Sequence, residues 1–241
     1  MPSLRATVWS SVGKKLITGI TGLALFSFVV VHLLGNLTIF LSPDAFNHYA
    51  HFLESLIHGW AVIAFEIGLL MILAFHVVSA VWVALLDKFR ARPVGYKKKG
   101  NAGGPSRKGI SSRSMIITGA VIAVFLILHV RMFKFGPTAM IPLGNGEEMK
   151  DLYSLVIWSF KNLWITLAYV AVMLLLGSHL WHGFWSAFQS LGLTNPRTMS
   201  LLQGLAAVFA LALGAGFLVL PLYAYFFVDA SSLNLAQGGL L

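Results

Sequence analysis

The stretch that decides the fold is LITGITGLALFSFVVVHLLGNLTIFL, residues 16–41, which contains no Lys, Arg, Asp or Glu. A transmembrane helix needs roughly 20 mostly apolar residues to cross the hydrocarbon core of a bilayer. The apolar residues here are continuous rather than alternating, which favours a helix over a barrel strand. We therefore predict that this stretch forms a membrane-spanning helix.

Four further segments have the same character, and the sequence predicts an all-α integral membrane bundle of five transmembrane helices, forming one membrane domain over residues 1–241. Hydrophobic residues make up 58% of the chain and charged residues 10%, whereas soluble domains carry about 25% charged residues. The chain has no cysteine, which excludes disulfides and iron–sulfur ligation on this chain. The expected spans are about residues 16–41, 59–86, 114–135, 162–192 and 198–228.

The distribution of Lys and Arg predicts the orientation. Thirteen of the seventeen fall in the N-terminal segment, in the loop of about residues 88–113 and at Arg197, all on one side of the expected bundle. Cytoplasmic loops are enriched in basic residues, so we expect a cytoplasmic N-terminus and an outside C-terminus in a multi-pass protein of the cell (inner) membrane. We interpret the net charge of +9 as this orientation signal rather than as nucleic-acid binding. The glycine-rich 88–113 loop is expected to be flexible.

Histidine is the residue type that points to function. The chain has eight, and the first four expected spans contain five of them. Ionisable side chains inside a bilayer are costly and mark functional sites. These five are His32, His76, His129, His179 and His182.

The positions of these histidines along their spans predict two pairs. His32 and His129 each follow the last basic residue before their outward-running span by about 16 residues, which places both toward the outer half. Counting residues from the start of the span in the same way places His76 and His179, which are on inward-running spans, toward the inner half. Two pairs at two depths are what two bis-histidine haems b require, and such an iron transfers electrons. Spacing alone leaves His182 open as the fourth ligand or as a partner of a haem propionate.

Three stretches strengthen this hypothesis: HLLGN at 32–36, AFNHYAHFLESL at 45–56 followed by FEIG at 65–68, and SHLWHGFWSAFQSLG at 178–192. With these stretches, the whole chain resembles the di-haem cytochrome b membrane subunit of succinate:quinone oxidoreductases, the succinate dehydrogenases and fumarate reductases of complex II and the tricarboxylic acid cycle.

The resemblance implies which histidines hold which haem. It makes His32 and His129 the iron ligands of a distal haem near the outer face, and His76 and His179 those of a proximal haem. It also favours His179 over His182, whose position is not always histidine in the family.

The resemblance further implies that the dicarboxylate site is on a partner. The partners are a flavoprotein subunit and an iron–sulfur subunit on the cytoplasmic side. This chain then transfers electrons between them and a membrane quinone in the bilayer. A distal site near the outer face favours menaquinone.

Several polar residues are candidates for proton and propionate chemistry. Quinone reduction needs a proton donor, and we assign Glu54 and His51, in the expected outer loop before the second span. Glu66 is the one acid deep within an expected span, and it either relays protons or bonds structurally across helices. Arg131 and Lys134, about one turn after His129, are placed to meet the distal haem propionates.

Two alternative functions stay open. The cytochrome b subunit of another respiratory dehydrogenase also binds two haems, although its histidines are distributed differently over the helices. A small transporter that uses histidines for proton relay would bind no haem and would often show broken helices. Neither an inverted nor any other internal repeat is expected from the sequence.

Overall fold

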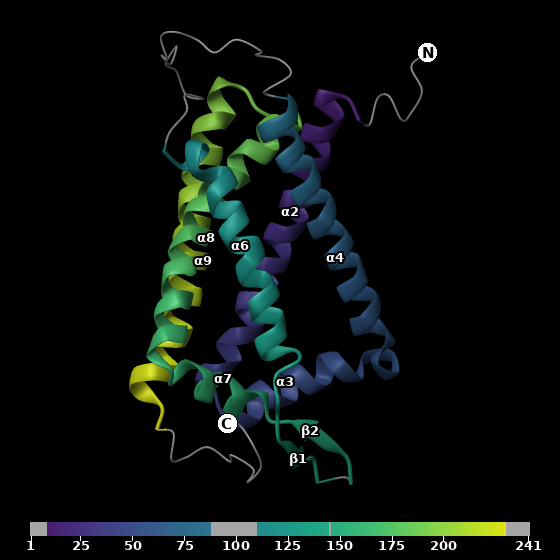
Figure 1. The fold of residues 1–241 in the computed structure, drawn as a ribbon, viewed down its shortest axis with the longest axis vertical. Helices are drawn as coiled ribbons and strands as arrows, with labels where there is room; N and C mark the ends of the chain where they lie inside the picture. The colour runs from purple at the N-terminus through teal and green to yellow at the C-terminus, as the bar shows by residue number, and fades with distance from the viewer. Residues whose placement is uncertain (1–8, 88–109, 145, 230–241) are drawn as a thin grey trace. The chain divides into compact units, whose positions relative to one another are not determined.

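The computed structural model describes residues 9–87, 110–144 and 146–229. It is 84% helical, and its described part contains five helices long and apolar enough to cross a membrane (Figure 1). This confirms the prediction of an all-α protein with five such helices. They are built on α2 (Ser11–Asn36), α4 (Trp60–Val81), α6 (Ile110–Phe133), α8 (Leu163–Ser190) and α9 (Pro196–Phe227).

Side-chain caps fix where the last two long helices begin. Asn162 Oδ1 accepts hydrogen bonds from the backbone N–H of Trp164 at 2.9 Å and of Ile165 at 3.3 Å, at the start of α8. Asn195 Oδ1 accepts in the same way from the N–H of Arg197 and Thr198 at the start of α9. An Asn at this position satisfies backbone donors that the helix itself leaves unpaired.

The segment before α4 differs from the expected loop. It forms an additional helix, α3 (Pro43–Ser55), which Ser42 caps by accepting the Ala45 N–H at 3.0 Å. A 3-10 turn, η2 (Leu56–Gly59), separates α3 from α4, and Ile57 and His58 within it have φ of 51° and 53°. Left-handed backbone is uncommon in such residues. It reverses the chain between two helices, so His51 and Glu54 lie on a helix rather than in a loop.

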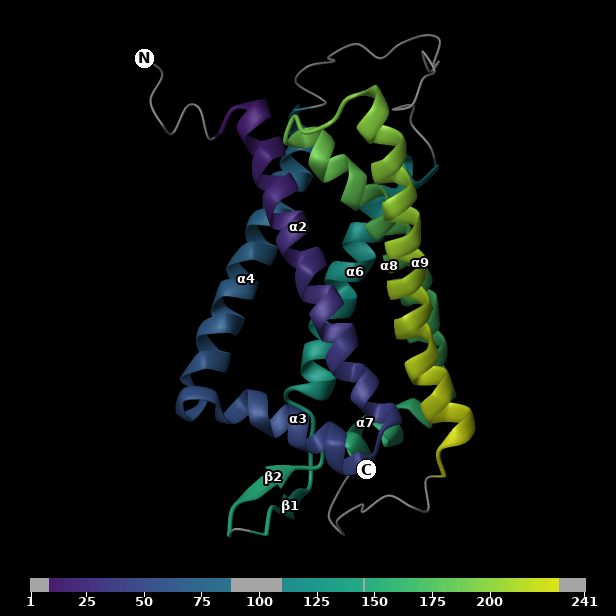
Figure 2. The ribbon, with the colours of Figure 1, turned by 180° about the vertical axis from the view of Figure 1, so that it is seen from behind.

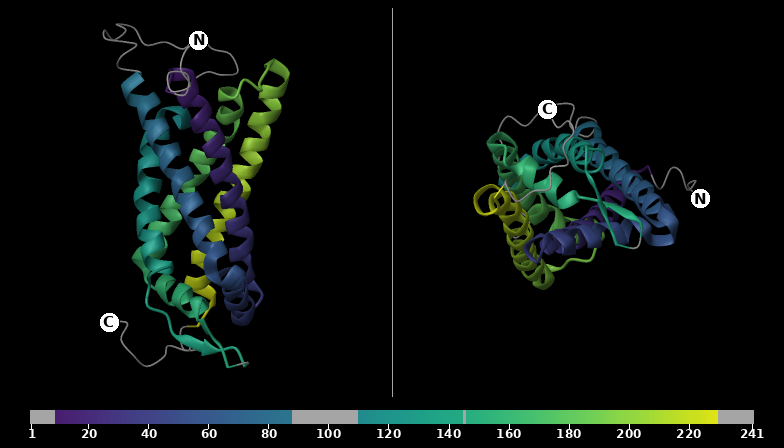
Figure 3. Two further views of the ribbon diagram at one scale, coloured as in Figure 1. Left: turned by 90° about the vertical axis from the view of Figure 1, so that its right-hand side faces the viewer. Right: turned by 90° about the horizontal axis from the view of Figure 1, so that it is seen from below.

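The helix α3 lies beside a small group of elements that follow α6. This group consists of a two-stranded antiparallel sheet, β1 (Met140–Pro142) and β2 (Glu148–Lys150), and of α7 (Leu152–Phe160). Figures 2 and 3 show α3 next to α7 and the sheet from other directions. The apolar residues of α7 are almost all buried, with Ile157 fully so.

A buried polar cluster joins α3 to α7. Asn47 donates to Asp151 Oδ1 at 2.9 Å, and its own Oδ1 accepts the Tyr153 N–H at 2.8 Å. Asp151 also accepts from the N–H and the hydroxyl of Ser154. Because buried polar groups are costly unless they are bonded, this cluster fixes how α3 sits on α7.

Contacts divide the chain into two compact units, each assembled from parts of several helices. Unit 1 comprises Met1–Val29, Ile67–Ala120 and Leu176–Ala212, and unit 2 comprises Val30–Glu66, Val121–Leu175 and Leu213–Leu241. His76, His179 and His182 belong to unit 1, whereas His32 and His129 belong to unit 2.

The expected loop of residues 88–113 lies mostly outside the described residues, which resume at residue 110. Residues 110–113 belong to the first turn of α6.

Candidate functional site

In unit 1, residues from neighbouring helices hold the histidines of α4 and α8 by their Nδ1 atoms. His76 Nδ1 lies 3.2 Å from the carbonyl oxygen of Thr18 and 3.3 Å from Thr21 Oγ1, both on α2. A carbonyl can only accept, so Nδ1 carries the proton and donates it. In this tautomer Nε2 keeps the lone pair that a metal ion uses.

His179 is held in the same way by α6. Its Nδ1 lies 3.0 Å from Thr118 Oγ1, and that hydroxyl donates its own hydrogen to the Met115 carbonyl at 3.2 Å. The threonine oxygen therefore accepts from Nδ1–H, which again leaves the lone pair on Nε2. Among the described residues none bonds to Nε2 of either His76 or His179.

A glycine follows each of these threonines and leaves room for the imidazole ring. A Cβ on Gly22 would lie 3.1 Å from His76 Cε1, and one on Gly119 would lie 3.3 Å from His179 Cε1. Both distances are shorter than ordinary van der Waals contact. We call Thr21-Gly22 and Thr118-Gly119 the Thr-Gly brackets of unit 1.

The two brackets share a short spacing pattern along the chain. Each Thr-Gly pair is followed by a span histidine, with Thr21 eleven residues before His32 and Thr118 eleven residues before His129. Eleven residues are about three helical turns, so threonine and histidine share one face of the helix.

A second pattern repeats on the other two helices, where a tryptophan follows each bracketed histidine by six residues. These tryptophans are Trp82 after His76 and Trp185 after His179. The sequence analysis missed the threonines, and the signal that could have found them is the tripeptide Ile-Thr-Gly, which occurs at 17–19, 20–22 and 117–119.

In unit 2, His32 and His129 face each other directly. Their ring centroids are 5.9 Å apart and their planes are almost perpendicular, at 87°. The Nδ1 atom of His129 lies 3.1 Å from the hydroxyl of Tyr169, a buried residue of α8. Aromatic rings surround the pair: Phe125, Phe133 and Tyr169 beside His129, and Phe217 beside His32.

His182, the alternative ligand of the fourth span, has a different environment from His179. Its ring packs at 4.7 Å against Trp185, and its Nδ1 is buried without a hydrogen-bond partner. No hydroxyl or carbonyl fixes its tautomer. His179 and His182 thus differ in that Nδ1 of His179 bonds to Thr118 and Nδ1 of His182 is buried without a partner among the described residues.

The residues present fit a bis-histidine haem. Among the described residues no group of three or more His, Cys, Asp or Glu side chains could hold a metal ion, but a six-coordinate haem iron takes only two protein ligands. The structure brings His32 to His129, and His76 and His179 both belong to unit 1. Metal-binding histidines in proteins almost always bond through their other nitrogen, and His76, His179 and His129 do so by Nδ1.

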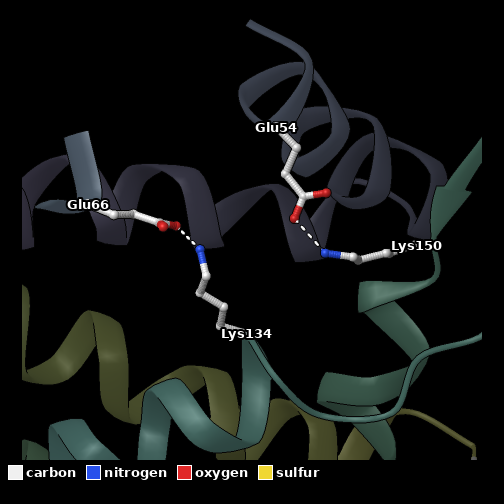
Figure 4. A network of polar contacts seen from close by, with 4 residues as sticks. All are labelled: Glu54, Glu66, Lys134 and Lys150. Carbon is white, nitrogen blue, oxygen red and sulfur yellow. Dashed lines mark hydrogen bonds and ion pairs between the residues drawn. The ribbon is translucent and has the colours of Figure 1, made fainter. Parts of the chain in front are cut away.

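The acids assigned to proton chemistry both form ion pairs in unit 2 (Figure 4). Glu54 lies 2.9 Å from Lys150 Nζ, and Glu66 pairs with Lys134. All four side chains are partly exposed, between 39% and 50%. Lys134, a propionate candidate, thus has a carboxylate partner on the chain itself, and Arg131 is exposed in the last turn of α6.

A small hollow lies beside the first of these ion pairs. Its lining residues include His51, Glu54, Lys150 and Phe133, and its volume is about 40 Å³. A hollow of this volume can hold a water molecule but not a quinone ring. The structure therefore brings His51 and Glu54 together, as the assignment to one site requires, and it adds Lys150, which the sequence analysis had not assigned to this site.

No family model, no curated protein and no solved structure matches this chain.

Proposed function

We propose that this chain is the membrane anchor and electron-transfer subunit of a succinate:quinone oxidoreductase of the complex II type. It would bind two haems b, one by His76 and His179 in unit 1 and one by His32 and His129 in unit 2. A flavoprotein and an iron–sulfur subunit would dock on the cytoplasmic side. The observation that carries the proposal is the pair of Thr-Gly brackets, which hold two histidines of different helices in the metal-binding tautomer.

The protein's own share is to position the ligands and to exclude water. When bound, a haem supplies one-electron transfer without proton chemistry at the iron. Thr21 and Thr118 keep the proton on Nδ1, so that Nε2 points its lone pair away from the bracket. Two histidines for each haem would leave no iron position for oxygen, which suits electron transfer rather than oxygen binding.

Unit 2 would also serve the quinone. Glu54 and His51 lie on one helix, beside a hollow that also borders Lys150. Because the carboxylate is partly exposed and paired, it can exchange protons with the aqueous phase while Lys150 moves away. The hollow would have to open for a quinone ring. Glu66 with Lys134 is the second proton-exchanging pair, and menaquinone is the quinone we favour.

The orientation we propose follows the charges. Of the basic residues, thirteen of seventeen belong to unit 1. The N-terminus would therefore be cytoplasmic and the C-terminus outside. A cysteine-accessibility experiment tests this: Ser3→Cys should react only with membrane-permeant reagents in intact cells, and Ser232→Cys also with impermeant ones.

The test of the proposal is the haem content of the purified protein, measured as pyridine haemochrome with reduced-minus-oxidised spectra. We expect two non-covalent, low-spin haems b per chain. Absence of haem from a folded preparation would refute the proposal and favour the transporter.

The assignment to complex II needs a second measurement. Succinate should reduce both haems in the complex purified with its partner subunits, and malonate should block this reduction. Reduction by hydrogen or formate but not by succinate would instead identify the cytochrome b of another respiratory dehydrogenase.

A further inference from the structure

Two buried side-chain nitrogens in the described part of the chain lack a hydrogen-bond partner, and both belong to unit 1. They are Nε1 of Trp82 and Nδ1 of His182. Native proteins keep few such atoms, and each one calls for an explanation such as a bound group that the chain does not itself supply. We therefore asked which ligand group both atoms could bind.

Both residues follow a bracketed histidine along the chain. Trp82 comes six residues after His76 and is the first residue of the π-helix η3 (Trp82–Asp87), which follows α4; His182 comes three residues after His179 on α8. The ends of α4 and α8 that follow these residues lie at the same end of unit 1 (Figure 1). The two unpartnered nitrogens thus lie toward one end of the histidine pair.

The indole of Trp82 is on the same side of α4 as His76. Residues 76, 79 and 82 all contact α2: His76 meets Thr18 and Thr21, Ser79 Oγ lies 2.7 Å from Thr18 Oγ1, and the Trp82 ring lies under Lys14. The Lys14 ammonium is 5.2 Å from the ring centroid, and the Trp9 ring packs at 5.8 Å. These contacts fix the indole.

The His182 ring is fixed by its own tryptophan. Trp185 packs edge-to-face on it at 4.7 Å and 81°. Trp185 occupies the repeat position that Trp82 occupies on α4, six residues after the bracketed histidine. The same end of the site therefore has a tryptophan on each helix, and one unpartnered nitrogen on each.

We propose that Trp82 Nε1–H and His182 Nδ1–H bind the two propionate carboxylates of the haem held by His76 and His179. This inference rests on the proposed function. An indole N–H only donates and an ionised carboxylate only accepts, and such charge-assisted bonds are stronger than neutral ones. A haem b has two propionates, which matches two donors. Arg131 and Lys134, the propionate candidates from the sequence, belong to unit 2 and remain available there.

The experiment is redox difference infrared spectroscopy on protein whose haem carries ¹³C-labelled propionates. A His129→Leu background removes the unit 2 haem, so that the labelled carboxylate bands report on unit 1 alone. Trp82→Phe removes one N–H and keeps an aromatic ring, and His182→Leu removes the other donor. Trp185→Phe is the matched control, since Trp185 is the repeat equivalent of Trp82 and has no unpartnered buried nitrogen among the described residues.

We expect one labelled carboxylate band to shift in Trp82→Phe and the other band to shift in His182→Leu. Neither band should shift in Trp185→Phe. A spectrum with unchanged bands in both donor variants, each still carrying the unit 1 haem, would overturn the inference while leaving the proposed function intact. Absence of haem from the wild-type protein would instead refute the proposed function.

If a donor variant fails to retain haem, the measurement is made instead on the protein that keeps both donors, Trp82 and His182. The labelled carboxylate bands should then shift on transfer to D₂O, because both donors exchange their hydrogens. Bands at the position of a protonated carboxyl group, or insensitive to exchange, would contradict the inference.

Discussion

The two units of this chain differ in charge and in how they hold their histidines. Unit 1 contains thirteen of the seventeen Lys and Arg residues but one of the eight Asp and Glu residues, and unit 2 contains the remainder. In unit 1, threonine hydroxyls and a carbonyl fix the tautomer of the bracketed histidines. In unit 2, the partner of His129 is a tyrosine hydroxyl within a group of aromatic rings.

Histidine thus has two different environments in this chain, one in each unit. His76 bonds to a carbonyl and His179 to a threonine hydroxyl, whereas His129 bonds to the hydroxyl of Tyr169, which also lies 3.9 Å from Met132 Sδ. Aromatic rings exclude water but supply few fixed dipoles. We therefore expect the two sites to differ in redox potential, and unit 2, which contains nearly all of the acids, to carry the proton chemistry.

The largest predicted effect concerns the ligand histidines and tests whether the two units hold separate haems. His76→Ala or His179→Ala should lower the haem content from two to one per chain, with loss of the unit 1 haem. His32→Ala or His129→Ala should remove the other haem, seen as loss of the second potential in a redox titration. His182→Ala is the control and should retain both haems. Loss of haem in His182→Ala alone, with His179→Ala unaffected, would reverse the assignment.

The second prediction tests whether quinone chemistry belongs to unit 2. Glu54→Gln should reduce the succinate:quinone reductase rate roughly 100-fold, the usual contribution of a positioned acid or base. The haem content should stay at two. A full rate in Glu54→Gln together with a large loss in Glu66→Gln would move the proton donor to the Glu66–Lys134 pair.

The third prediction compares the histidine supports of the two units. Thr118→Val should weaken retention of the unit 1 haem by about 10- to 100-fold, the range for loss of a residue that orients a metal ligand. Tyr169→Phe should act in the same range on the unit 2 haem only, and each loss can be followed by haem release to apomyoglobin. Thr118→Ser keeps the hydroxyl and should restore retention. If Thr118→Ser behaves like Thr118→Val, the threonine acts by packing rather than by its hydrogen bond.

The smallest predicted effects concern stability within unit 2. Asn47→Ala leaves the Tyr153 N–H and Asp151 buried with fewer partners and should lower the free energy of unfolding by about 2 kcal/mol. Lys150→Gln removes an exposed ion pair and should cost less than about 1 kcal/mol. Thermal unfolding in detergent measures both, and equal costs would contradict the buried role of Asn47.

Much of the fold could be predicted from sequence because helix formation in an apolar segment is a local property. The expected span of residues 162–192 contains the observed helix Leu163–Ser190, and that of residues 198–228 differs from Pro196–Phe227 by two residues or fewer at each end. The helix α3 was missed although Ser42, Pro43 and Asp44 are a local signal for its start; its Phe52 and Leu53 side chains stay exposed, so it lacks a continuous buried face. The reversal at Ile57 and His58 has no glycine signature in those two residues.

The sequence by itself determined that the chain has five apolar helices, that histidines lie within four of them, and that most of its basic residues fall within residues 1–15, within 88–113 and at Arg197. These features are local or additive, since each depends on residue type and chain position alone. Only the tertiary structure decided which helix supports each imidazole, that Glu66 meets Lys134, and that His179 has a fixed tautomer while His182 has none. Such pairings depend on the rotation and tilt of each helix. A helix that is apolar on all sides does not encode its own rotation or tilt.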